Sequence, residues 1–201
     1  MIDALFGSKT RVKLLHLFLN NPGQSFFVRE ITRKIDEQIN SVRRELANML
    51  EVGIITSDSA VNKLYYQVNQ RYDYYVPLRS IFSDIKPEES SAVKSVDGSQ
   101  FENYASLINT VSGIRLAILA GVLIRGSTSS VDMLLVGNLS VQKLRTVIKD
   151  IEISEGREIN YSVLSYDEFY YRLSVKDKFI TEILNNKHKV IIDKDKVLLK
   201  E

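Results

Sequence analysis

The chain of 201 residues contains no cysteine and only two histidines. Without cysteine it has no disulfide framework, no thiolate zinc site and no cysteine nucleophile. His16 lies within VKLLHLFL and His188 within NNKHKV, and neither stands in a cluster of metal-ligating residue types. Three classes are therefore excluded: disulfide scaffolds, zinc proteins with thiolate ligands and enzymes with a catalytic cysteine.

Long hydrophobic runs are also absent. The longest apolar stretch, IRLAILAGVLIR, is bounded by arginines and is much shorter than the roughly 20 residues of a membrane-spanning helix. It is better interpreted as a buried strand. The first residues, MIDALFGSKTR, lack the basic segment and apolar run of a signal peptide. We therefore expect a cytoplasmic protein without a membrane partner.

The net charge of +2 is too small to indicate a partner, but its distribution is informative. Residues 8–79 hold 11 lysines and arginines against 7 aspartates and glutamates, a net charge of +4, whereas residues 86–201 hold 16 of each kind. A basic excess in the first third of the chain favours a nucleic-acid partner for that part.

A polar stretch divides the chain. KPEESSAVKSVDGS (86–99) is rich in serine, contains Pro87 and Gly98 and shows no apolar periodicity, which is typical of an interdomain linker. We expect an α+β protein with two domains, residues 1–85 and residues 100–201, joined by this linker.

Three helices are predicted in the first part. Ser8 is placed to cap the first, which NNPG (20–23) ends. After a short extended segment, SFFV, the second helix covers 28–35 and the third covers 39–52, with Gly53 as its end. The periodicity of the third helix predicts that it buries Ile39, Val42, Leu46 and Leu50.

A hairpin with strands near 54–57 and 64–68 follows, and YDYYVPLRSIF predicts a further helix. This order of elements, together with LANMLEVGII (46–55), resembles the winged helix-turn-helix transcription regulators of the arsenic-repressor and multiple-antibiotic-resistance type. The resemblance covers about residues 5–82 and implies a DNA-binding domain whose third helix enters the major groove.

The outward face of that third helix carries amide and guanidinium groups, which hydrogen-bond base edges in a major groove. We expect four of its residues to read bases and three basic residues elsewhere to contact phosphates. The base-reading candidates are Asn40, Ser41, Arg43 and Arg44, and the phosphate candidates are Arg29, Arg33 and Lys63. Two alternatives stay open: a protein-docking module, and arginines that are only solvated helix surface.

The second part contains GVLIRGSTSSVDMLLVG (121–137). From about residue 100 to residue 193, the chain resembles a polymerase-beta-type nucleotidyltransferase that has lost part of its site. In that family a Gly-Ser binds the triphosphate, and two aspartates with a third carboxylate hold two Mg²⁺ ions. Gly121, Arg125 and Asp132 match the family pattern. Val122 stands at the place of the phosphate-binding serine, and Ser130 at the place of the first aspartate.

The third carboxylate is expected on the strand REINYSVLS (157–165), where Asn160 is the best match and Glu158 the alternative. One aspartate cannot replace three carboxylates, so the resemblance implies a pseudoenzyme without a metal or another cofactor. Its vestigial site comprises Gly121, Arg125, Ser130, Asp132 and Asn160. The Gly121 turn and Arg125 remain candidates to receive a small anionic effector.

The tail YDEFYYRLSVKDKFITEILNNKHKVII adds to this resemblance. Nucleotidyltransferase-like domains fused behind winged helices in prokaryotic regulators share its Glu168–Phe169 pair, a second phenylalanine at Phe179 and its last strand. Its apolar residues are expected in the core, namely Phe169, Leu173, Phe179, Ile183 and Leu184.

The function we expect is sequence-specific regulation of transcription by a homodimer. The second domain is expected to serve dimerisation or effector sensing. The tyrosine-rich segment 65–82 and the apolar face of the first helix are candidate dimer contacts. Two other classes stay open: an active or antitoxin-type nucleotidyltransferase that docks through the winged helix, and a protein-interaction module without DNA binding.

Overall fold

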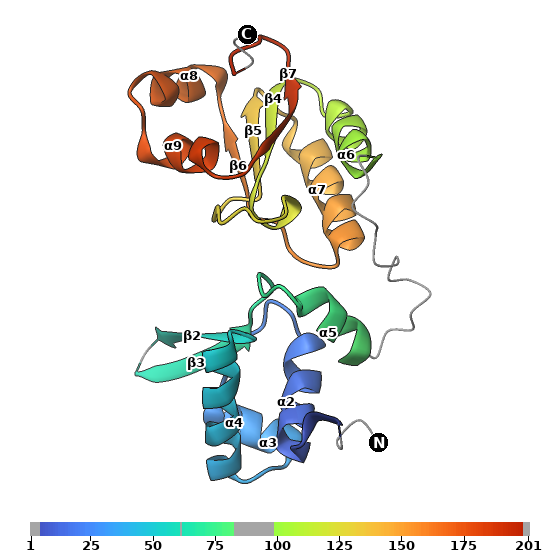
Figure 1. The fold of residues 1–201 in the computed structure, drawn as a ribbon, viewed down its shortest axis with the longest axis vertical. Helices are drawn as coiled ribbons and strands as arrows, with labels where there is room; N and C mark the ends of the chain where they lie inside the picture. The colour runs from blue at the N-terminus through green and yellow to red at the C-terminus, as the bar shows by residue number, and fades with distance from the viewer. Residues whose placement is uncertain (1–4, 61, 83–98, 199–201) are drawn as a thin grey trace. The chain divides into compact units, whose positions relative to one another are not determined.

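The computed structural model describes residues 5–60, 62–82 and 99–198. The chain is an α+β protein that divides into two compact units, Met1–Ser91 and Ala92–Glu201. Figure 1 shows the elements of each unit. The expected linker, 86–99, lies outside the described residues except for Ser99, at which helix α6 begins.

The three helices predicted in the first unit are present. They are α2 (Lys9–Leu19), α3 (Val28–Ile35) and α4 (Ile39–Val52). The Ser8 hydroxyl caps α2 by accepting a hydrogen bond from the Arg11 amide at 3.3 Å. Gly53 ends α4 with a left-handed φ of 84°, a conformation that costs glycine little.

The predicted hairpin is also present, as part of a three-stranded antiparallel sheet. Strands β1 (Phe26–Phe27), β2 (Ile55–Ala60) and β3 (Lys63–Val68) lie in the order β1-β3-β2. Helix α5 (Tyr75–Phe82) follows, with Pro77 in its first turn, where proline is tolerated because that N–H has no partner within the helix.

One core holds the first unit together. It includes Leu14, Leu15, Phe18, Ile31, Val42, Leu46, Met49, Tyr75 and Phe82.

Two predictions for the first unit are wrong. Ile39, at the first turn of α4, is 38 % exposed, and Met49 and Glu45 occupy inward positions instead. The apolar face of α2 is buried in this core, so that face is not available as a dimer contact.

The second unit is built on a mixed sheet. Its strands are β4 (Ile114–Leu119), β5 (Met133–Gly137), β6 (Tyr161–Leu164) and β7 (Lys189–Asp193), in the order β6-β5-β4-β7. Strand β4 pairs antiparallel with β5 and β7, whereas β5 and β6 are parallel and are joined by α7 (Val141–Glu155). The strand expected over IRLAILAGVLIR ends at Leu119, because Gly121–Leu123 form a 3-10 turn.

Helices cover both faces of this sheet (Figure 1). One core lies between the sheet and helices α6 (Ser99–Asn109) and α7. The other lies between the sheet and helices α8 (Tyr166–Ser174) and α9 (Lys178–Asn185). As expected, Phe169 and Ile183 are buried and Leu173, Phe179 and Leu184 pack against the second of these cores.

None of the helices described in either unit has the length and apolar character that crossing a membrane requires.

A buried carboxylate connects α2 to α4. Glu45 is 2 % exposed, and its Oε2 accepts a hydrogen bond from Arg11 Nε at 3.0 Å. Burial by itself raises the pKa of Glu45, but hydrogen bonds from Ser8 and Arg11 outweigh it, so the pKa is lowered. On the next turn of α2, Lys13 donates to the carbonyl of Ile35 at 2.8 Å, at the end of α3.

We expect Arg11→Met to reduce the local stability of α2 and α4 by about 2 kcal/mol, because the buried Glu45 carboxylate loses its charged donor. Hydrogen exchange of the full chain, followed by mass spectrometry, measures this. Lys9→Met, an exposed change on the same helix, is the control and should have no effect.

The same experiment has a pH dependence. Because the pKa of Glu45 is lowered by folding, its contribution is present above the unfolded value of about 4.3. It is lost as the pH falls through the folded value. The difference in local stability between wild type and Arg11→Met should therefore shrink in acid. A difference that grows in acid would contradict the stabilising role of the Arg11–Glu45 pair.

Candidate functional site

The base-reading candidates lie on the side of α4 that faces away from the core. Asn40, Arg43 and Arg44 are exposed and Ser41 is half-buried. Val42 and Leu46, on the opposite side of the helix, are 0 % and 1 % exposed. The first turns of α4 therefore present an amide, a hydroxyl and two guanidinium groups to solvent.

The phosphate candidates are exposed as well. Arg29 and Arg33 lie one helical turn apart on α3, and Lys63 begins β3. Helix α3 leads into α4 through a short turn in which Asp36 adopts a left-handed φ of 50°. The structure thus carries basic side chains on α3, on α4 and at the hairpin.

Two carboxylates near these elements, Glu37 and Glu45, are paired with cations of α2. Lys13 pairs with Glu37 at 2.9 Å and Arg11 with Glu45 at 3.0 Å, whereas Glu30 has only a 4.0 Å contact with Lys34. The Arg44 guanidinium lies 4.0 Å from Glu45, and its side chain is 73 % exposed.

Three arginines keep their charge available. Within residues 5–60, 62–82 and 99–198, the side chains of Arg29, Arg33 and Arg43 form no ion pair or hydrogen bond. Because α2 supplies the cations for Glu37 and Glu45, these arginines are left for an external anion.

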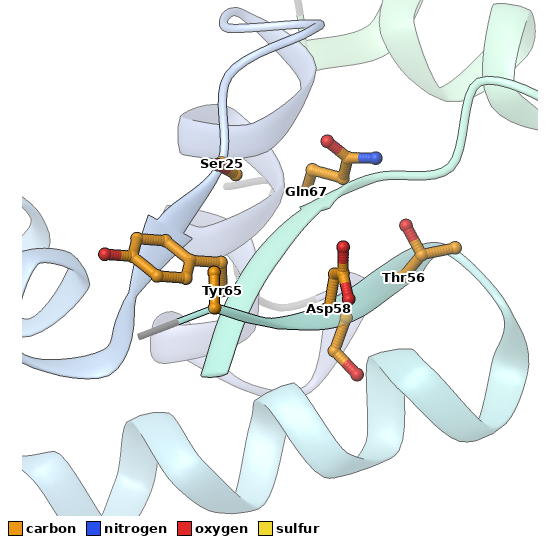
Figure 2. Close-up of a pocket in the computed structure, with 7 residues that line it drawn as sticks. Ser25, Thr56, Asp58, Tyr65 and Gln67 are labelled. Carbon is orange, nitrogen blue, oxygen red and sulfur yellow. The ribbon is translucent and has the colours of Figure 1, made fainter. Parts of the chain in front are cut away.

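A groove of about 290 Å³ opens on the sheet of the first unit. Figure 2 shows Thr56 and Asp58 from β2, Tyr65 and Gln67 from β3 and Ser25 before β1 around it. The pairing of Asp58 with Tyr65 and of Thr56 with Gln67 places these side chains on one face of the sheet. All the residues that line the groove except Ala60 carry a hydrogen-bonding side chain.

The Lys63 ammonium lies on the same face, 4.7 Å from the centre of the Phe27 ring. That ring meets Tyr65 edge to face at 5.9 Å. The Phe27 ring thus holds a cation near the turn of the hairpin, where β3 begins.

In the second unit, Asp132 is fully buried, with 0 % exposure. Its Oδ1 accepts the Val122 amide and its Oδ2 accepts the Asn160 amide, each at 2.8 Å. Both carboxylate oxygens thus bind backbone, one from the turn after β4 and the other from the residue before β6. This arrangement makes Asp132 a structural residue that holds three segments together.

Asn160 and Ser130, which were also predicted for this site, lie beside Asp132. The Asn160 side chain donates to the Ser130 carbonyl at 3.3 Å. Ser130 is exposed and its hydroxyl lies 3.3 Å from Glu182 of α9. Glu158, the alternative third carboxylate, is exposed and precedes β6. The described residues include no group of three or more His, Asp and Glu side chains arranged to hold a metal ion.

The turn expected to receive an anion is already occupied. The Gly121 amide donates to Ser127 Oγ at 3.0 Å and the Val122 amide donates to Asp132. Both amides of the Gly121 turn are thus bound within the chain, and binding of a small anionic effector at this turn and Arg125 stays a prediction. Arg125 is exposed, and a Cβ built on the adjacent Gly126 would lie 3.1 Å from Lys187 Nζ, so two cations remain beside this loop.

Sequence patterns did not reveal the roles of Glu45, Glu182 and Lys187. Glu45 lies 34 residues from Arg11, and Glu182 lies 52 residues from Ser130. The only local signal was a carboxylate at an inward position of α4, between Val42 and Leu46.

Comparison of the chain with protein-family models, with curated proteins and with solved structures finds no significant match.

We expect Asp132→Asn to destabilise the second unit by about 2 kcal/mol, because an amide side chain has one acceptor oxygen for two backbone donors. Amide hydrogen exchange by NMR, read at Val122 and Asn160, measures the loss. Ser130→Ala is the matched control, since its hydroxyl is exposed, and should leave both amides protected. Unchanged or greater protection in Asp132→Asn would mean that the carboxylate is not structural.

Proposed function

We propose that the chain is a DNA-binding regulator of transcription whose first unit binds duplex DNA through α4. In this proposal Asn40, Ser41, Arg43 and Arg44 read base edges. Arg29, Arg33 and Lys63 contact phosphates. The observation that carries the proposal is the exposed basic surface of α3 and α4, on which the side chains of Arg29, Arg33 and Arg43 form no ion pair with the described residues.

The order of elements supports the proposal. The structure has three helices with a short turn between the second and third, followed by a hairpin that pairs with a short strand. This order is the one expected of a winged helix-turn-helix domain. In such domains the second helix of the pair enters the major groove. Here that helix is α4, and its buried side packs on α2 and α3.

The groove beside the hairpin gives the proposal a second surface. Lys63 is held over Phe27 at the start of β3, and hydroxyl, amide and carboxylate groups line the neighbouring groove (Figure 2). A hairpin with a cation and hydrogen-bonding groups suits contact with the DNA backbone beside a helix in the major groove. Asp58 is the one anionic group in that lining, and it limits how closely a phosphate approaches.

For the second unit we propose a nucleotidyltransferase-like fold without transferase activity, which serves dimerisation or effector sensing. The support is the state of Asp132, whose two oxygens are both bound to backbone amides, because a two-metal site needs converging carboxylates that are free to bind cations. A small anionic effector would bind at the Gly121 turn and Arg125, with Lys187 beside Gly126 as a further cation.

Substitution of the arginines on α4 tests the DNA proposal. Duplexes selected from a randomised pool by the full chain are labelled, and binding is followed by fluorescence anisotropy at several salt concentrations. Arg43→Ala and Arg44→Ala should each cost about 1–3 kcal/mol and relax the preference at one base position. Arg145→Ala, an exposed arginine of α7, is the control and should bind as wild type does.

The phosphate contacts have a different signature. Arg29→Ala and Arg33→Ala should weaken binding to all duplexes alike and reduce the slope of log K against log salt by about 1 each. Equal binding by wild type and the Arg43→Ala/Arg44→Ala variant at every salt concentration would remove α4 from the interface.

Incubation of the full chain with labelled nucleoside triphosphates and Mg²⁺ or Mn²⁺ tests the proposal for the second unit. We expect no label on the chain, on added RNA or on added protein. Label transfer that responds to Ser130→Ala or Glu182→Gln, which leave the buried Asp132 in place, would favour the enzyme over the pseudoenzyme.

A further inference from the structure

Strands β6 and β7 are the two edges of the second sheet. An edge strand presents unpaired backbone groups, which proteins protect with charges, proline or a covering segment. Strand β7 has such protection. It begins at Lys189, whose ammonium lies 4.0 Å from the centre of the Phe101 ring of α6, it ends at Asp193, and α6 packs against it.

Strand β6 lacks charges and proline. The segment INYSVLSY (159–166), which contains the strand, has no charged residue, no proline and no glycine. Tyr161 and Val163 are 38 % and 41 % exposed. Their pairing with Met133 and Leu135 of β5 places both on the same face of the sheet. This edge therefore carries two exposed apolar side chains of types that favour strands.

The backbone N–H and C=O groups of Tyr161 and Val163 also point away from β5. The Asn160 amide donates to Asp132 Oδ2, and the Asn160 carbonyl accepts from the Asp132 amide at 2.7 Å. Both polar groups of Asn160 thus face β5. Because successive residues of a strand direct these groups to opposite sides, those of Tyr161 and Val163 face away from β5, toward the open edge.

We propose that β6 is a homodimer interface, at which two copies of this chain pair their β6 strands antiparallel about a two-fold axis through Ser162. In this register Tyr161 of one copy lies opposite Val163 of the other, twice. The pairing joins two four-stranded sheets into one continuous sheet.

The register is self-complementary, which is the reason to choose a second copy as the occupant. The outward N–H and C=O groups belong to Tyr161 and Val163, and directly opposed residues of a hydrogen-bonded antiparallel pair exchange both bonds. The same alignment sets an aromatic beside a β-branched side chain on each side of the axis, a favourable cross-strand pair. Ser162 meets its own copy, where a small side chain fits the closer non-hydrogen-bonded spacing.

The choice also rests on the proposed function, because a two-fold protein presents two α4 helices to a two-fold operator. The mass of the protein is measured without DNA, so the experiment tests the proposed dimer independently of the proposed DNA binding.

Sedimentation of the full chain from about 1 to 100 μM tests the interface. We expect a mass approaching twice the 23.0 kDa of one chain. Val163→Pro should return the mass to one chain, because it removes an outward N–H that β5 does not use, and proline is tolerated on such an edge. Val141→Lys, which replaces a 62 % exposed valine of α7, is the control and should dimerise.

Two double variants test the register. Y161K/V163E places a lysine opposite a glutamate at both pairs and should dimerise, whereas Y161K/V163K places lysine opposite lysine and should stay monomeric. This comparison holds even if Val163→Pro fails to fold. A wild-type chain of single mass at every concentration would overturn the proposal. So would a dimer that Y161K/V163K leaves intact, because another surface would then form it.

Discussion

Helix α4 is packed on one side only, by Val42, Leu46 and Met49, which are 0 %, 1 % and 2 % exposed. This burial fixes the rotation of the helix, since turning it would expose these side chains. About 25 cal/mol for each Å² of apolar surface opposes such a change. The direction in which Arg43 and Arg44 point is therefore a consequence of the core.

The charges of α2 complete this arrangement. Arg11 binds Glu45 of α4 and Lys13 binds both Glu37 and the end of α3. These two cations connect α4 and the end of α3 to α2, and they pair with the carboxylates of Glu45 and Glu37. If the first unit binds DNA as proposed, the same ion pairs serve stability and binding, because without them Glu45 and Glu37 would compete with phosphates for the arginines of α3 and α4.

In the second unit, an aspartate predicted from the sequence to belong to a vestigial metal site has a structural role instead. The Asp132 carboxylate joins the turn after β4, the start of β5 and the approach to β6. By binding the Asn160 amide it also sets the direction of the backbone along β6, and with it the outward groups of Tyr161 and Val163. One buried aspartate thus links the turn at Gly121 to the proposed dimer edge.

Much of the fold could be predicted because its signals are local. Ser8 marks the start of α2 because its hydroxyl caps the helix, and Gly53 marks the end of α4 because glycine readily adopts a left-handed φ. Apolar periodicity located α2, α3 and α4. Ile39 was misplaced because periodicity does not say where a helix first meets its core. The strand expected to extend past Leu119 was too long, since nothing in its apolar letters marks the turn at Gly121. The Arg11–Glu45 pair joins residues 34 apart, and the bond between Asn160 and Asp132 joins residues 28 apart, so neither could be read from spacing.

The proposed contact between α4 and duplex DNA can be measured by amide chemical-shift mapping of the full chain, titrated with its selected duplex and with a single strand of the same sequence. We expect the duplex to shift the amides of residues 39–47, with smaller changes near Arg29, Arg33 and Lys63, and the single strand to shift none of them. Shifts confined to residues 100–198, or none in α4 at saturating duplex, would contradict it.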